Sequence, residues 1–135
     1  GANSDIELKE KADRIEDAIC ATKAAIKEGI VPGGGIALLN ASHNIDTFSL
    51  GEEILLDSIR APFRTILDNA GIEDAPLETI SKIGYGLNVV TGETVNMIDA
   101  GIIDPLLVTK SALRNAASVA TTILSTDCVI NNLRA

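Results

Sequence analysis

Aromatic side chains are almost absent from this chain. Its 135 residues include no Trp, one Tyr and two Phe, so aromatics make up 2% while hydrophobic residues make up 46%. The core must therefore be built from Ile, Leu, Val and Ala, which suits packed helices better than a β-sandwich, where aromatics and Thr are common. The length is that of one ordinary domain.

Basic residues, cysteine and histidine are scarce as well. Lys and Arg number 11 against 19 acidic residues, giving a net charge of −8 without any basic run, which argues against a nucleic-acid partner. Two distant cysteines, Cys20 and Cys128, and the single His43 argue against a metal site and favour a reducing compartment. No apolar run is long enough to span a bilayer, so we expect no membrane partner. We interpret Gly1-Ala2-Asn3, which lacks an initial Met, as a processing or expression scar.

A long helix is predicted from Ser4 to Glu28, because apolar residues recur there at intervals of three and four and Gly29 is a natural stop. The stripe that we expect to be buried consists of Leu8, Ala12, Ile15, Ile19, Thr22 and Ile26. Asp17 lies two residues after Ile15, about 200° around the helix, so it points away from the stripe. By itself, Asp17 is interpreted as one more solvated carboxylate.

The middle of the chain predicts further helices from its apolar periodicity. They are expected at residues 35–43, 52–69 and 75–83. Pro62 lies inside the longest of them, so we expect a kink at that point, and Gly71 is expected to end that helix.

The period then changes to that of strands. Residues 87–97 predict a β-hairpin with a Gly-containing turn. Asp104-Pro105 predicts a helix start, with Asp104 as the N-terminal cap and the helix ending near Ser125. Residues 127–131 are short, β-branched and apolar, and predict a C-terminal strand.

Three consecutive glycines, Gly33-Gly34-Gly35, follow Pro32 and open the second helix. They leave backbone N–H groups uncovered at a helix N-terminus that carries about half a positive charge, so a phosphate can approach closely. Taken alone, the run favours a turn between packed helices in which glycine avoids a clash, and phosphate binding is the alternative.

Several separated motifs together resemble one family, the group I chaperonins, which are ring-forming protein-folding machines. The resemblance covers essentially the whole chain after the scar. Its motifs are Arg14-Ile15-Glu16-Asp17-Ala18, Gly33-Gly34-Gly35, Ala61-Pro62, Asn96-Met97-Ile98-Asp99 and Gly101-Ile102-Ile103-Asp104-Pro105. It implies a mainly α fold, the helical bundle of the chaperonin equatorial domain with a small β-hairpin and a C-terminal strand. Residues 4–32 would be the end of the intermediate domain and a long helix into the equatorial domain, and residues 33–135 the C-terminal half of that ATP-binding, ring-contact domain.

The resemblance also implies a nucleotide site. In the family, the glycine that matches Gly34 lies with its backbone against the nucleotide. The aspartate that matches Asp104 hydrogen-bonds the ribose hydroxyls. Asn88, Val89 and Val90 match hairpin residues that line the adenine pocket. Asp17 matches the catalytic carboxylate that positions the attacking water. Leu87 departs from the Tyr that the family often has before the pocket Asn.

One part of the family's ATP site has no counterpart here. The phosphate-binding loop, Asp-Gly-Thr-Thr in character, does not occur in this chain, and the Mg²⁺ ligands belong to the same absent half. We therefore expect a fragment of an ATP-dependent chaperonin. The full-length parent would bind ATP and Mg²⁺, whereas the fragment holds part of the site, no metal ligands and no bound cofactor, and is inactive alone.

The resemblance further implies partners and a compartment. The parent would form a homo- or hetero-oligomeric ring, typically a heptameric double ring, with a co-chaperonin and unfolded clients held by an apical domain that is absent here. The unpaired strand at residues 127–131 and apolar helix faces lead us to expect that the fragment self-associates. The compartment would be the bacterial cytoplasm or an organelle matrix or stroma, with Pro32 and the ending at 125–129 favouring a plastid.

Two alternatives belong to other classes. Composition and periodicity alone allow a self-contained acidic helical interaction module without nucleotide, which the separated motifs disfavour. A small nucleotide-binding enzyme is disfavoured because no Lys directly follows the glycines and no histidine that could act as general base lies near them.

Overall fold

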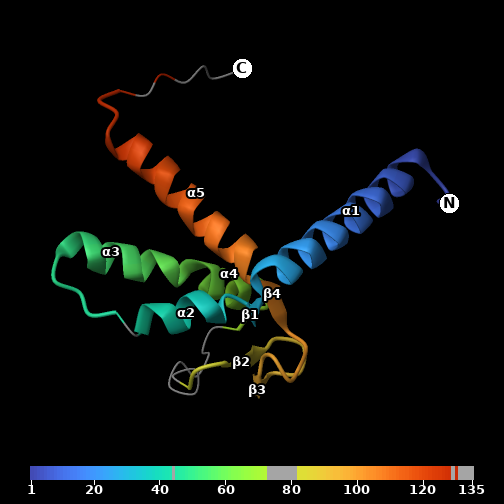
Figure 1. Ribbon diagram of the computed structural model, residues 1–135, viewed down its shortest axis with the longest axis horizontal. Coiled ribbons are helices and arrows are strands. Elements are labelled where there is room, and N and C mark those ends of the chain that lie inside the picture. The colour runs from blue at the N-terminus through green and yellow to red at the C-terminus, as the bar shows by residue number, and fades with distance from the viewer. Residues whose placement is uncertain (44, 73–81, 129, 131–135) are drawn as a thin grey trace. The chain divides into compact units, whose positions relative to one another are not determined.

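The chain forms two compact units, the first of which we call the helical unit and the second the central unit. The computed structural model describes residues 1–43, 45–72, 82–128 and 130 (Figure 1). The helical unit consists of Gly1–Glu28 and Leu106–Ala135, and the central unit of Gly29–Pro105. The fold is mainly helical with small antiparallel sheets, as predicted from the sequence. The sequence predicts a boundary at residue 33 between the intermediate and equatorial domains of the family that the chain resembles. That boundary stays a prediction.

The helical unit is built on α1 (Asp5–Glu28) and α5 (Leu106–Leu124). The extent of α1 confirms the predicted helix, and Gly29 ends it with a φ of 87°, a left-handed conformation that glycine adopts readily. The last turn of α1 contacts the first turns of α5, where the Lys110 ammonium lies 2.8 Å from the Glu28 carboxylate.

The predicted apolar stripe of α1 is exposed, so the prediction that it is buried is wrong for this structure. Leu8, Ile15, Ile19 and Ile26 all lie at the surface, whereas Ala24 is buried. The cause is that α1 packs on α5 only near its C-terminal end. Helix α5 likewise has no buried residue.

Two small antiparallel sheets hold the central unit together. The first pairs β1 with β4, in a register that sets Val31 opposite Asp104, and we call it the β1–β4 ribbon. The second is a hairpin of β2 and β3, in which Tyr85 lies opposite Asn96. The elements of this unit are β1 (Ile30–Pro32), α2 (Ile36–His43), α3 (Leu50–Ile59), α4 (Ala61–Asn69), β2 (Tyr85–Asn88), β3 (Glu93–Asn96) and β4 (Ile103–Pro105).

The core of the central unit is aliphatic, as the composition predicts, with one aromatic ring. Its buried members are Ile36, Leu39, Phe63, Leu67, Leu87 and Met97. Ile36 and Met97 are the most completely buried, at 0% and 1% exposed, and full burial of such side chains stabilises a fold by about 1.5–3 kcal/mol each. The core therefore joins α2 and α4 to the hairpin.

The helix predicted over residues 52–69 is two helices, so the expected kink is instead a break. Helix α3 ends at Ile59 and α4 begins at Ala61, with Arg60 between them donating its N–H to Asp57 O at 3.2 Å. Pro62 lies in the first turn of α4, where a missing N–H removes no intrahelical bond. A new helix can therefore begin at this proline.

Both ends of this helix pair are capped. Ser49 and Glu52 form a reciprocal capping box, which starts α3 two residues earlier than predicted. At the other end, Gly71 has a φ of 70° and donates its N–H to Asp68 O, while Ile72 donates to Leu67 O, both at 3.0 Å. This pattern is a Schellman motif and confirms Gly71 as the stop.

Of the remaining predictions of secondary structure, some are confirmed and others are wrong. The hairpin is confirmed, although β2 begins at Tyr85 and its loop contains Val89 and Val90. Asp104 is a residue of β4 and α5 begins only at Leu106, so its predicted role as the helix cap is wrong. The described residues of the predicted C-terminal strand, 127, 128 and 130, are not in a strand. The helix predicted at 75–83 falls almost wholly outside the described residues.

The capping box makes the stability of α3 depend on pH. Hydrogen bonds from the N–H of Phe48, the larger effect, and of Ser49 hold the pKa of Glu52 below its ordinary value of 4.5. The ionised form is therefore the stabilising one, with its contribution present above 4.5 and lost as the pH falls through the lowered pKa.

Replacing Glu52 by Ala is therefore expected to lower the free energy of unfolding at neutral pH, by an amount that shrinks in acid. Thermal or urea unfolding at a series of pH values measures it. Glu53→Ala, one residue further along the same exposed turn, is the control. An equal loss for the two variants, or a Glu52 effect that does not change with pH, would contradict the role of this carboxylate.

Candidate functional site

The three glycines form a tight turn that joins the β1–β4 ribbon to α2. Gly33 donates its N–H to Ile102 O at 2.9 Å, and its own carbonyl accepts from Ile36 at 3.1 Å. Gly34 and Gly35 have φ values of 64° and 77°, in the left-handed region. The amides of Gly34 and Gly35 donate no hydrogen bond to any residue that the structure describes. An oxyanion could accept hydrogen bonds from these two groups at the start of α2.

Each glycine of the turn also has a packing reason. A Cβ at Gly35 would lie 2.8 Å from the backbone nitrogen of Phe63, and one at Gly33 would lie 3.2 Å from the carbonyl of Ile102. At Gly34 the nearest atom is Met97 Cε, at 3.1 Å. Close packing, the plainer reading of the glycine run, is therefore confirmed, and it leaves the open amides in place.

The hairpin residues lie in and beside a loop that is closed by hydrogen bonds. Asn88 ends β2, its side-chain oxygen accepts from Val90 N at 3.0 Å, and its carbonyl accepts from Gly92 N at 2.7 Å. Val89 and Val90 are exposed, Val90 at 90%, whereas Leu87 is buried in the core. The loop thus presents two apolar side chains to solvent while Leu87 attaches it to the central unit.

Asp104 and Asp17 belong to different units. Asp104 is exposed on β4 and lies opposite Val31 of β1. Because Val31 precedes Gly34 by only three residues, the ribbon places Asp104 on the strand next to the start of the glycine turn. The central unit therefore contains five of the six predicted site residues. Asp17 is an exposed residue of α1 in the helical unit.

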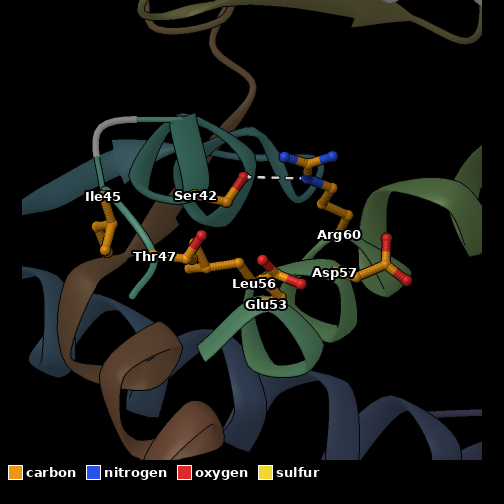
Figure 2. A pocket seen from close by; sticks show the side chains of 7 residues that line it. All are labelled: Ser42, Ile45, Thr47, Glu53, Leu56, Asp57 and Arg60. Carbon is orange, nitrogen blue, oxygen red and sulfur yellow. Dashed lines mark hydrogen bonds between the residues drawn. The ribbon is translucent and has the colours of Figure 1, made fainter. Parts of the chain in front are cut away.

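A pocket that sequence reasoning missed lies elsewhere in the central unit, between the end of α2 and the helix break (Figure 2). Its volume is about 250 Å³, and it contains none of the predicted site residues. The buried Ser42 Oγ donates to Leu39 O at 2.7 Å and accepts from Arg60 Nε at 3.3 Å, which ties α2 to the junction of α3 and α4. The lining residues are Ser42, Ile45, Thr47, Glu53, Leu56, Asp57 and Arg60. No sequence motif predicts the contact between Ser42 and Arg60, because serine and arginine are ordinary surface residues and these two are far apart in the sequence.

Within the described ranges, no three His, Cys, Asp or Glu side chains lie close enough together to hold a metal ion. Cys20 and Cys128 are both exposed and free. None of the helices in this part of the chain has the length and apolar character needed to cross a membrane.

Replacing Gly35 by Ala is expected to destabilise the central unit, because the new Cβ meets backbone at 2.8 Å and the φ of 77° is unfavourable for Ala. We expect a loss of about 2–4 kcal/mol in the free energy of unfolding, measured in urea. Gly71→Ala is the matched control, since its φ of 70° is similar but no atom lies within 4 Å of the added Cβ. Equal losses at both positions would show that backbone conformation alone, and not the approach to Phe63, requires glycine.

The model of the TCP-1/cpn60 chaperonin family matches residues 1–134. Among solved structures, the chain is similar to a group III chaperonin in the open state, with a TM-score of 0.79 and 29% sequence identity. The match covers 96% of this chain and 30% of that one, so the chain spans less than a third of the length of that chaperonin. Because the family model matches nearly every residue, the chain belongs to the TCP-1/cpn60 chaperonin family.

Proposed function

We propose that this chain is part of a group I, ATP-dependent chaperonin and that its central unit supplies one side of the nucleotide site. The observation that carries the proposal is the glycine turn. Its two open amides begin α2, and the ribbon and core connect them directly to the Asn88 loop and to Asp104. A nucleotide needs donors for its phosphates, an acceptor for its ribose and a partly apolar surface for its base, and these three kinds of group occur in this one unit.

The roles follow from the chemistry of each group. The amides of Gly34 and Gly35 would donate to phosphate oxygens, helped by the positive end of α2. Asp104 is exposed and would accept hydrogen bonds from the ribose hydroxyls. Val89 and Val90 offer apolar contact to the base, beside the amide group of Asn88. ATP with Mg²⁺ is the proposed cofactor of the longer protein, in which Mg²⁺ would neutralise charge on the phosphates.

Asp17 is proposed to act in hydrolysis. It is an exposed carboxylate on a helix, free to meet a water molecule, and orienting water toward a phosphate is much of what a protein does in this reaction. We propose that the chain alone does not hydrolyse ATP, since no Asp-Gly-Thr-Thr sequence occurs in it to hold the phosphates.

The exposed faces of the helical unit support an assembly role. Helices α1 and α5 present large aliphatic side chains to solvent, among them Ile15, Ile19, Val119 and Ile123, and exposed apolar surface of this kind often marks a contact with another protein. We propose that other parts of a ring-shaped chaperonin cover these faces, and that the chain self-associates when they are missing. Binding of a co-chaperonin and of unfolded clients would belong to other regions of the longer protein, located in a bacterial cytoplasm or an organelle.

Changing Asp104 to Asn tests the ribose contact. The change keeps size and shape but weakens the acceptor, so we expect the affinity of the longer protein that carries this sequence for adenosine and for ADP to fall about tenfold. Isothermal titration or NMR titration measures both. Asp99→Asn, an exposed residue in the turn before Gly101, should leave both affinities unchanged. Unchanged binding by the Asp104 variant would remove this residue from the site, and absence of binding by the unaltered longer protein would favour the interaction module without nucleotide.

Asp17 is tested in the longer protein that carries this sequence. Asp17→Ala should leave ATP affinity within about twofold and slow hydrolysis by about a hundredfold or more, because the carboxylate would act on water rather than on the bound ground state. Phosphate release and equilibrium binding are measured side by side. Asp13→Ala, one turn earlier on α1 and equally exposed, should behave as the unaltered protein. Normal hydrolysis by the Asp17 variant would show that Asp17 is only a solvated carboxylate without a role in catalysis.

A further inference from the structure

The motif Asn96-Met97-Ile98-Asp99 has no role in the proposed nucleotide site, yet it contains the only methionine of the chain. Met97 directly follows β3 and is 1% exposed. A long, flexible thioether is suited to filling an irregular gap between rigid segments. The segments that border Met97 are therefore informative.

The side chain of Met97 lies between the two parts of the proposed site. Its Cε would be 3.1 Å from a Cβ at Gly34, in the glycine turn. Its Sδ would be 2.9 Å from a Cβ at Gly86, in strand β2 two residues before Asn88, beside Ile36 of α2, whose Cγ1 and Cδ1 would be 2.6 and 2.8 Å from the same Cβ. Both positions are glycine, so the thioether packs directly against backbone on each side. It acts as a spacer between the turn and the hairpin.

The backbone of Met97 makes a second connection between the same two parts. Its N–H donates to Gly84 O at 3.0 Å, at the base of the hairpin. Its carbonyl accepts from Ile102 N at 2.8 Å, and the Ile102 carbonyl accepts from Gly33 N at 2.9 Å. These three hydrogen bonds form a continuous path from the hairpin to the glycine turn, with Met97 in the middle.

We propose that Met97 is a positioning residue that sets the spacing between the glycine turn and the Asn88 loop, and so determines how well a complete nucleotide binds. This inference rests on the proposed function. A nucleotide has a phosphate end and a base end joined by a short sugar, and it gains from both contacts only when their spacing matches. The effect of Met97 would pass through the two glycines that it packs against, Gly34 and Gly86.

The predicted consequence separates a complete ligand from a partial one. Met97→Leu nearly conserves volume, which buried sites tolerate well, but it shortens the reach toward Gly34. In the longer protein that carries this sequence, we expect the affinity for ADP to fall about ten- to a hundredfold, while adenosine, which does not use the glycine turn, keeps its affinity within about twofold. NMR titration measures both affinities and also the shift of the Gly34 amide on adding ADP, which the variant should lose. Met97→Ile is made in parallel, so that a folding defect in one variant does not end the test.

A core variant without these glycine contacts provides the control. Leu67 on α4 belongs to the same core and is 7% exposed, but it is not among the nearest neighbours of Gly34 or Gly86. Leu67→Ala should lower thermal stability while keeping the ratio of ADP to adenosine affinity. Equal losses of ADP and adenosine affinity in the Met97 variants would show that Met97 acts only as a core residue. A changed ratio of the two affinities in the Leu67 variant would show the same. If the unaltered longer protein binds neither ligand, the proposed function fails and this inference falls with it.

Discussion

The backbone of residues 33–35 packs closely against three other segments, most tightly at Gly35, where an added Cβ would lie 2.8 Å from the backbone nitrogen of Phe63. It meets the carbonyl of Ile102, the thioether of Met97 and the first turn of α4 at Phe63. The glycine turn thereby packs against the start of β4, the residue that follows β3 and the first turn of α4. The same constraint keeps the amides of Gly34 and Gly35 free of side chains. Close packing and two amides that donate to no described residue therefore occur in one feature, so the packing role does not exclude the phosphate binding that we propose for this turn.

Much of the fold follows from local rules that operate within a few residues. The long helix α1, its stop at Gly29, the Schellman motif at Gly71 and the turn of the hairpin each depend on a periodicity or on a residue that is suited to one backbone conformation. The errors arose where partners distant in sequence decide. Asp104-Pro105 has the local chemistry of a helix start, but pairing with β1 makes it a strand. Likewise, the Arg60–Ser42 contact accompanies a break where only a kink was expected.

The site was predicted from motif matches, and geometry adds how its parts are joined. Gly34, Asn88 and Asp104 could be named from the sequence because each matches a family position. The connection between them could not, since it runs through Met97, Gly86 and Ile102, whose contacts are invisible without the fold. The exposed stripe of α1 shows the opposite case. Its periodicity correctly predicts an apolar face, but periodicity cannot tell which molecule or segment covers that face.

The ribbon of β1 and β4 has a consequence for how the chain must fold. Ile30 lies opposite Pro105, so the central unit begins and ends at one antiparallel pair and forms a single closed loop. Closing a loop has an entropic cost that grows with the logarithm of its length. The hydrogen bonds of only three residue pairs offset a small part of that cost. The burial of Ile36, Met97 and their neighbours must offset that cost. The ribbon is therefore the contact that depends most on the rest of the unit being folded, although it is also the one that brings Asp104 next to the glycine turn.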